Sequence, residues 1–243
     1  MSSPPHQTQI WRMARAAGCL YAAIILLGLS AELGIRSQLI QPDDTAATVS
    51  AILTHGGLFR LGLAADLTMA LCDAGLALLF YFMFRATAPA LALSAMVFRL
   101  LQTGVIAVNL LNLQAAWLLI NGLSGSTEGD QATMAMQFLL LHGYGYDLGL
   151  LFFGVNGLLM AALIWQSRLF SRVFAVGLGV AGVIYLTGSG LRFLVPDLAE
   201  GFEPAYGIPI LAESLFCIRL LIGSGFASKR LERAIASHTP EEK

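Results

Sequence analysis

The hydrophobic and polar positions along the chain divide it into six long apolar segments separated by short polar stretches. A helix needs about 20 apolar residues to cross the roughly 30 Å hydrocarbon core of a bilayer, and each segment is long enough. None shows the alternation of a membrane barrel strand, and open sheets do not cross lipid. The pattern predicts an all-α polytopic membrane protein, a bundle of six transmembrane helices at about residues 14–34, 58–84, 91–120, 137–165, 172–195 and 207–227.

The first apolar segment has two possible interpretations, a signal peptide or a permanent membrane helix. Arg12 and Arg15 precede it, as positive residues precede the apolar part of a signal peptide. Its length suits a spanning helix, and Leu29-Ser30-Ala31 is a poor cleavage site. We therefore expect an uncleaved anchor and treat residues 1–243 as a single membrane domain.

The connecting segments carry their own signals. Asp44 precedes 45–54 as an N-cap would, and Gly56–Gly57 follow as a helix end would, which predicts a short amphipathic helix in the first outer loop. The stretches 121–131 and 202–209 are expected to be loops, the first because it is polar and rich in Gly and Ser, the second because it contains two prolines.

Composition agrees with a membrane location and excludes a disordered chain, a nucleic-acid-binding protein and a small secreted protein held by disulfides. Charged residues make up 12% of the chain, against about 25% in an average soluble domain. Hydrophobic residues make up 57%, and the mean hydropathy is +0.73. A formal net charge of −1 gives no reason to expect a nucleic-acid partner. The three cysteines fall in apolar segments and are interpreted as reduced thiols rather than as disulfides or metal ligands.

The distribution of Lys and Arg between the connecting segments predicts the orientation. Nine fall on one side and define the expected cytoplasmic face: Arg12, Arg15, Arg85, Arg168, Arg172, Lys229, Arg230, Arg233 and Lys243. The other side has Arg36, with Arg60 and Arg192 at helix ends, and its loops are acidic. Both termini are therefore expected in the cytoplasm. An even number of helices agrees with this, because it places both termini on the same side of the membrane.

Ionisable residues within the apolar segments are the main candidates for function or for helix pairing. Without the histidine, four are positive and four negative, which indicates internal pairing. They are Arg60, Asp66, Asp73, Arg99, His142, Asp147, Arg192, Glu213 and Arg219.

Residues near the membrane midplane form a predicted structural polar core. Asp73 is expected to pair with Arg99 or with Arg219, and such a pair would either orient helices or take part in a transport or proton step. The predicted core comprises Asp73, Arg99, Gln102, Asn109, Asn156 and Arg219.

Residues nearer the outer face form a predicted ligand-binding pocket, comprising Arg60, Asp66, His142, Tyr146, Asp147, Arg192 and Glu213. Its carboxylates and histidine suit a cation, a proton or a divalent metal; the alternative is a set of separate salt bridges to Arg60 and Arg192. A catalytic zinc usually has more His or Cys ligands, so no metal site, cofactor or catalytic residue is assigned.

The run from His142 to Asp147 is locally unusual because Gly143 and Gly145 alternate with Tyr144 and Tyr146. Glycines at this spacing favour a kink or the close approach of another helix. The run is interpreted either as a packing surface with interfacial tyrosines or as the wall of a ligand site.

Short motifs in five of the six apolar segments form a recognisable set. They are Ala14-Arg15-Ala16-Ala17-Gly18, Ala31-Glu32 with Arg36, Gly57 to Arg60 with Asp66 and Asp73, Arg99 to Gln102 with Asn109 and Asn112, His142 to Gly154, and Arg192 with Pro196. Together they resemble a family of bacterial multi-pass membrane proteins known only as domain of unknown function 4386. The resemblance extends over nearly the whole chain and implies the fold and a bacterial inner-membrane location, but no activity.

One position departs from that family's pattern. Asn156 stands where many relatives carry a histidine. If that histidine were a metal ligand, this chain would lack it, so the departure argues against an obligatory metal here.

The leading hypothesis for function is an integral inner-membrane protein with an outward-facing polar pocket. Its expected partners are the lipid bilayer and a small molecule, a lipid headgroup or a cation, with no nucleic acid. A secondary transporter is the main alternative, and a metal-dependent intramembrane hydrolase is a weaker one.

Overall fold

The computed structural model describes residues 5–122 and 128–222, in which every regular element is a helix. The elements in chain order are α1 (Pro5–Leu29), the π-helical segment η1 (Ser30–Arg36), α2 (Ser37–Leu39), α3 (Thr45–Thr54), α4 (Gly56–Phe84), α5 (Pro89–Ile120), α6 (Glu128–Ser167), α7 (Arg172–Leu194), α8 (Pro196–Phe202), the 3₁₀ segment η2 (Glu203–Tyr206) and α9 (Gly207–Ile222).

Six helical stretches in the described chain are long and apolar enough to cross a membrane, which confirms the predicted fold class. They are Gln9–Leu39, Gly56–Phe84, Pro89–Ile120, Asp130–Ser167, Arg172–Leu194 and Pro196–Ile222. Large apolar side chains cover their outer surfaces, among them Leu71 and Val108. Since water would not stabilise such a surface, the chain is a multi-pass integral membrane protein.

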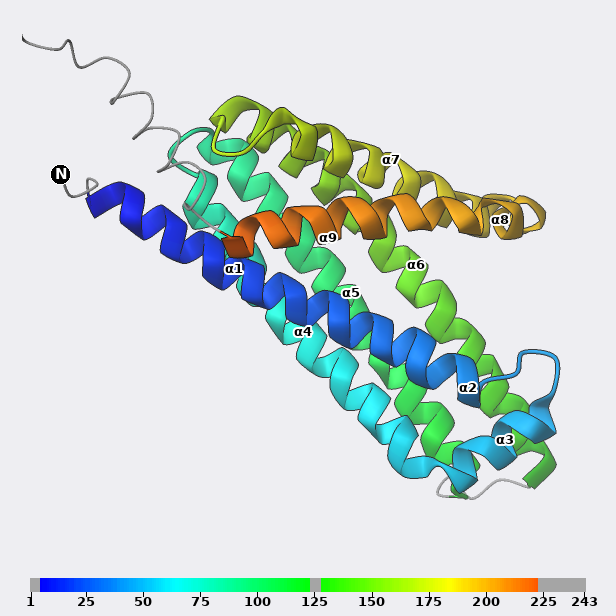
Figure 1. The fold of residues 1–243 in the computed structure, drawn as a ribbon. Coiled ribbons are helices and arrows are strands. Elements are labelled where there is room, and N and C mark those ends of the chain that lie inside the picture. The colour runs from blue at the N-terminus through cyan, green and yellow to red at the C-terminus, as the bar shows by residue number, and fades with distance from the viewer. Residues whose placement is uncertain (1–4, 123–127, 223–243) are drawn as a thin grey trace, which may run out of the picture.

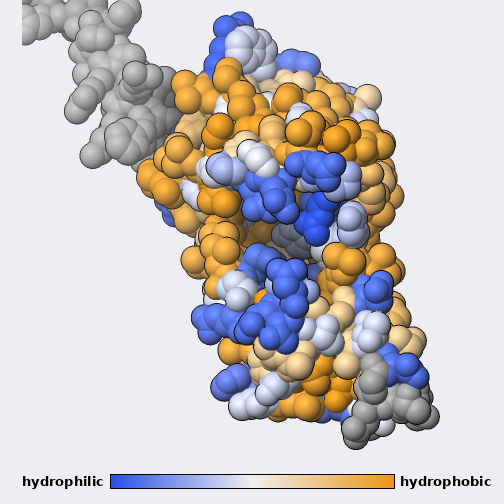
Figure 2. Space-filling model, turned by 90° about the vertical axis from the view of Figure 1, so that its right-hand side faces the viewer, coloured by the Kyte–Doolittle hydropathy of each residue, from blue (hydrophilic) through white to orange (hydrophobic). Residues whose placement is uncertain are grey.

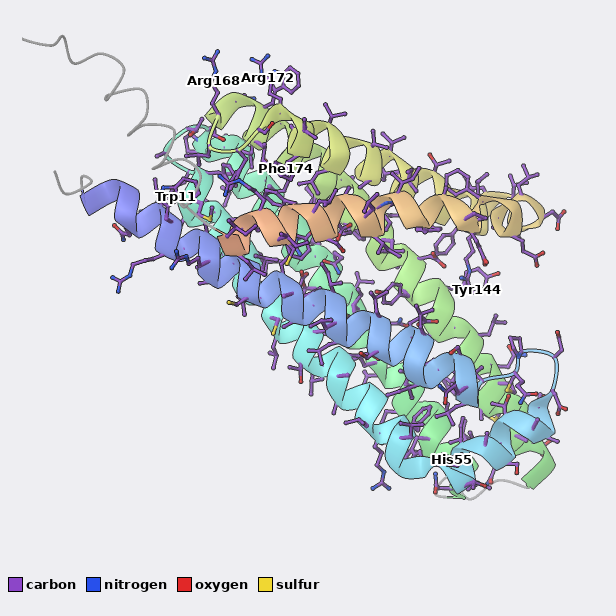
Figure 3. The ribbon with its side chains drawn as sticks, viewed as in Figure 1. Trp11, His55, Tyr144, Arg168, Arg172 and Phe174 are labelled. Carbon is purple, nitrogen blue, oxygen red and sulfur yellow. The ribbon has the colours of Figure 1, made fainter. Side chains whose placement is uncertain are left out.

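The helices form a fork with a narrow end and a wide end (Figure 1). The narrow end holds the start of α1 and the α4–α5 and α6–α7 turns. From there α7, α8 and α9 run along one arm, while α1 to α5 and the first half of α6 make up the other (Figure 1). Figure 3 shows Trp11, Arg168 and Arg172 at the narrow end, with His55 near the tip of the larger arm.

Tight packing closes the narrow part of the fork. Phe216 of α9 is fully buried among aromatic rings, including Phe170 at 5.3 Å and Phe80 at 6.1 Å between centroids. A Cβ at Gly18 of α1 would lie 2.8 Å from the backbone nitrogen of Leu221, so only glycine lets α1 and α9 cross here. The two arms are therefore joined at one end and free to diverge at the other.

The first spanning helix is longer than predicted. It was expected to end near residue 34, but η1 and α2 continue it to Leu39. The π-helical turn holds both Glu32 and Arg36, and Arg36 is only 7% exposed. The expectation that Arg36 belongs to an outer loop is therefore wrong.

The segment 202–209, predicted to be a loop, is also helical. Pro196–Ile222 forms one spanning stretch through α8, η2 and α9. Pro196 is the first residue of α8, Pro204 is the second residue of η2, and Pro209 lies in the first turn of α9. Proline is tolerated at such positions because the first amides of a helix have no intrahelical acceptor.

The short helix of the first connecting segment is confirmed at Thr45–Thr54. Asp44 caps it, since its side chain accepts a 2.8 Å hydrogen bond from the amide of Ala47. Ile52 is fully buried against the larger arm. The prediction that Gly56–Gly57 end this helix is wrong, because His55 separates the two helices and Gly56 begins α4.

Parts of three predicted segments lie outside the described residues. They are 123–127 of the expected polar loop, 223–227 of the sixth predicted helix, and the charged C-terminal segment beyond it. The described part of the first includes Glu128 to Gln131, which begins α6 instead of completing a loop.

Candidate functional site

A cavity of about 820 Å³ lies between the two arms of the fork. Its wall comes from the end of α1 with η1 and α2, from α4, α5, α6 and α7, and from η2 and α9. In the view toward the wide end, hydrophilic residues gather on both sides of a central hollow, within a mostly hydrophobic surface (Figure 2). The cavity thus has a largely apolar lining into which a set of polar and charged side chains projects.

The floor of the cavity is a buried ion pair between α4 and α5. Arg99 donates to Asp73 Oδ1 from Nε at 2.9 Å and from Nη2 at 2.5 Å. Thr103, one turn beyond Arg99, donates to Asp73 Oδ2 at 2.6 Å. Of the two predicted partners of Asp73, the structure therefore selects Arg99.

Asn156 connects this floor to α6. Its Nδ2 donates to the carbonyl of Ala95 at 2.7 Å, and its Oδ1 lies 3.5 Å from Arg99 Nη1. Asn156 is 2% exposed and is not part of the cavity wall. Its amide therefore joins α5 to α6 beneath the cavity, as expected for a structural residue.

The wall on the larger arm is built around Arg36. Its guanidinium bonds to both oxygens of Asp66 on α4 and, through Nε, to Glu32 Oε2 at 2.8 Å. Arg36 and Glu32 line the cavity, whereas Asp66 lies behind Arg36 and outside the wall. Asp66, predicted as a ligand-binding residue, instead holds the arginine that lines the site.

The wall between α5 and α6 contains His142. Asn109 Nδ2 lies 3.1 Å from His142 Nδ1 and donates to the carbonyl of the same residue at 2.8 Å. A Cβ at Gly145 would collide with the Asn109 side chain. The glycines were expected to favour either a kink or the close approach of another helix. The structure shows the close approach, and α6 continues as a single helix through this run.

The wall on the smaller arm pairs α6 with α7. Arg192 Nη1 lies 3.0 Å from Asp147 Oδ2, and the guanidinium also lies over the ring of Tyr144 at 5.1 Å. Ser189 donates to Asp147 Oδ1 at 3.4 Å. Tyr144 projects from α6 into the space between the arms (Figure 3). Asp147 thus forms a salt bridge to Arg192, which the sequence analysis gave as the alternative to a shared cation site.

Glu213 of α9 is held by two tyrosines instead of by a basic residue. Tyr21 donates to Oε2 at 3.0 Å and Tyr185 donates to Oε1 at 2.7 Å. Glu213 is 8% exposed and lines the cavity. The carboxylate is therefore oriented from both sides without a salt bridge among the described residues.

Two oxygens in the cavity wall are buried without a hydrogen-bond partner within the described chain: Gln102 Oε1 and Asp147 Oδ2. Arg192 lies within ion-pair distance of Asp147 Oδ2, but none of its N–H groups is directed for a hydrogen bond to that oxygen. Gln102 has no such neighbour and is 8% exposed. Because buried polar atoms normally have partners, these two mark where a ligand donor would fit.

Two predicted residues lie elsewhere. Arg60, placed in the pocket by the sequence, is exposed and lies 4.5 Å from the ring centroid of Trp117, outside the cavity. Arg219, placed in the polar core, lies over the rings of Trp11 and Phe170 near the narrow end. Neither residue lines the cavity. The sequence could not show this, because helix limits alone do not reveal which neighbouring helix each side chain contacts.

The described residues contain no group of three His, Cys, Asp or Glu side chains able to hold a metal ion. The carboxylates expected near His142 are separated, since Asp66, Asp147 and Glu213 bind different partners on different helices. The hydrolase alternative therefore has no set of ligands in this part of the chain.

The site combines a polar floor with an apolar rim. Its rim includes Leu33, Leu140 and Ile210, which are 65%, 55% and 44% exposed. These side chains add accessible apolar surface to the cavity. The arrangement can accommodate a molecule with one polar end and one apolar end.

Sequence reasoning missed several residues of the site: Tyr21, Glu32, Arg36, Thr103 and Tyr185. Thr103 was detectable, because it follows Arg99 by four residues and shares its face. The four-residue spacing of Glu32 and Arg36 was a comparable signal. The two tyrosines gave none, because tyrosines in apolar helices are commonly interfacial.

Comparison with known proteins places the chain in a family. The profile of the family described as Domain of unknown function (DUF4386) matches residues 16–223. This range covers most of the chain and most of each of the six spanning stretches. No significant match exists among curated proteins or among solved structures. The family match agrees with the resemblance carried by the motifs, and the chain belongs to the DUF4386 family.

Proposed function

We propose that this protein is a membrane-embedded binding protein that accepts one small amphipathic molecule in the cavity between its arms. The cavity opens to the outer face of the bacterial inner membrane, and both termini are cytoplasmic. The whole chain acts as a single membrane domain.

The observation that carries this proposal is the unpartnered Gln102 Oε1 in the wall of the 820 Å³ cavity. A buried acceptor without a donor costs about 1–3 kcal/mol of stability. That cost is removed when a ligand, or a water that bridges to one, supplies the missing bond. The volume also falls within the roughly 300–1,000 Å³ of typical small-molecule sites.

The amphipathic character of the ligand follows from the two surfaces that meet in the cavity. Asp73, Arg99 and Glu213 supply buried polar groups, whereas Leu33 and Ile210 supply exposed apolar side chains to the same cavity. A ligand with an apolar tail would enter from the bilayer and keep that tail between the arms. A wholly polar solute would leave the apolar rim unfilled.

The outward orientation is supported by charge. Arg85, Arg168 and Arg172 lie at the narrow end, where basic residues indicate the cytoplasmic side. The wide end carries Asp43, Asp44, Asp197, Glu200 and Glu203 instead. With that assignment the cavity faces away from the cytoplasm.

The proposal is tested by native mass spectrometry with elemental analysis on protein extracted gently from its own membrane. We expect a stoichiometric small molecule on the wild-type chain and its loss in Gln102→Leu, which removes the amide at similar volume. The matched control is Gln114→Leu on the same helix, whose side chain lies outside the cavity and should leave occupancy unchanged.

Either of two outcomes would overturn the proposal. The first is a wild-type protein that carries only bulk lipid. The second is a bound molecule that Gln102→Leu and Gln114→Leu retain equally. In both cases the polar groups of the cavity would serve the packing of the helices alone.

A further inference from the structure

Glu213 stands apart from the other carboxylates of the cavity. Asp73, Asp147 and Glu32 each lie within 4 Å of a guanidinium nitrogen, and so does Asp66 behind the wall. Glu213, by contrast, has only phenol partners among the described residues, although it is more than nine-tenths buried. A buried carboxylate without a counter-ion is costly in an apolar medium, so a positive charge placed beside Glu213 would stabilise it.

The carboxylate has room for such a charge. Its two oxygens offer about four lone-pair sites, and the two tyrosine hydroxyls occupy two of them. The guanidinium of Arg99 lies over the ring of Tyr21 at 5.4 Å, but its Nε and Nη2 are directed at Asp73. The remaining acceptor capacity of Glu213 is therefore open to a group in the cavity, which Glu213 lines.

The ionisable side chains around the whole cavity carry a net negative charge. The wall and the residues bonded directly to it contain five carboxylates, Glu32, Asp66, Asp73, Asp147 and Glu213, but only three guanidinium groups, Arg36, Arg99 and Arg192. Every one of those guanidinium groups contacts a carboxylate. An anionic ligand would therefore meet an excess of carboxylates, whereas a cation meets in Glu213 a carboxylate that no guanidinium of the described chain contacts.

Aromatic rings near Glu213 supply a second attraction for a cation. Phe153 and Tyr185 lie 5.3 Å apart, and Tyr185 and Tyr206 lie 5.9 Å apart, between ring centroids. All three rings line the cavity, and Tyr185 also holds the carboxylate. The faces of such rings attract alkylammonium groups, which lose less hydration than a metal ion when they enter an apolar site.

We propose that the ligand of this cavity is a cationic amphiphile, an alkylammonium whose positive group binds at Glu213 and whose apolar chain extends toward the apolar rim. This inference rests on the proposed binding function and adds the charge of the ligand to it. Gln102 lines the same cavity, and its Oε1, unpartnered within the described chain, is an acceptor for an N–H of the ligand or for an O–H of a bridging water.

The test uses the full chain purified in dodecyl maltoside and three probes with the same tail: dodecylammonium, dodecyl phosphate and dodecanol. Binding of the radiolabelled probes is measured by scintillation proximity. We expect dodecylammonium to bind at least tenfold more tightly than the other two. In Glu213→Gln we expect that preference to fall at least tenfold. The matched control is Glu203→Gln, an exposed position outside the cavity, which should behave like the wild type.

The outcomes separate this inference from the function on which it rests. If none of the three probes binds the wild-type chain, the proposed binding function fails as well. If dodecyl phosphate or dodecanol binds as tightly as the cation, the binding function stands and the cationic assignment is overturned. The same conclusion follows if a folded Glu213→Gln keeps the cation preference. The comparison of probes on the wild-type chain remains decisive even if that variant does not fold.

Discussion

Arg99 directs two of its nitrogens at one oxygen of Asp73, at 2.9 and 2.5 Å, while Thr103 occupies the other oxygen. Asp73 and Arg99 are 4% and 2% exposed. The guanidinium also contacts the rings of Tyr21, Phe80 and Phe153. The pair thus fixes α4 against α5 at the depth where the two arms separate.

Asp73→Asn is expected to lower the free energy of unfolding by about 3–5 kcal/mol, because it leaves the buried charge of Arg99 uncompensated. The measurement is unfolding by sodium dodecyl sulfate in mixed micelles. The control is Asp197→Asn on the exposed helix α8, which should change stability by less than about 0.5 kcal/mol. A change at position 73 as small as that of the control would show that the pair does not hold these helices together.

Arg36 and Arg60 offer a contrast between two arginines of the larger arm. Arg36 is buried against Glu32 and Asp66, whereas Arg60 is exposed over Trp117. Arg36→Gln should cost about 3 kcal/mol or more, because Asp66 loses its partner. Arg60→Gln should cost at most about 1 kcal/mol, the value of an exposed cation–π contact. Equal losses in the same unfolding assay would contradict the assignment of Arg36 to the cavity wall.

Much of the fold could be predicted because hydropathy reports directly on which segments meet lipid. All six spanning helices and the short helix with its Asp44 cap are present. The ends were less predictable, because proline and charged residues resemble loop signals. Pro204 and Arg36 both stand inside helical stretches, one at the start of a 3₁₀ turn and one in a π-helical turn, where neighbouring elements stabilise them.

The residues of the site could be predicted only in part, and their pairings could not be predicted. Periodicity places Asp66 and Asp73 on one face of α4, and both are indeed buried. It does not reveal that they contact different helices, η1 and α5. Pairing depends on how helices are ordered around the bundle, which short connections do not fix. Glu213 illustrates the limit, since its partners Tyr21 and Tyr185 lie 192 and 28 residues away.

Close packing of α5 against α6 yields a third prediction. Gly145→Ala should destabilise the protein by about 1–3 kcal/mol, because the new methyl group would collide with Asn109, which binds His142. Gly104→Ala on α5 is the control, since a Cβ there meets nothing within 4 Å. That control should be neutral or stabilising by up to about 1 kcal/mol, because glycine disfavours helices. Equal stability of the two variants would mean that α5 and α6 do not approach each other as described.

The central claim is that a polar cavity reaches Gln102 from the outer face of the membrane. In a chain carrying Cys19→Ala, Cys72→Ala and Cys217→Ala, the variants Gln102→Cys and Val108→Cys compare the cavity wall with the lipid-facing side of the same helix, where Val108 is 68% exposed. The measurement is labelling of intact cells with a membrane-impermeant thiol reagent. The account predicts that Gln102→Cys is labelled and Val108→Cys is not. Labelling of Gln102→Cys only after the cells are permeabilised, or not at all, would contradict it.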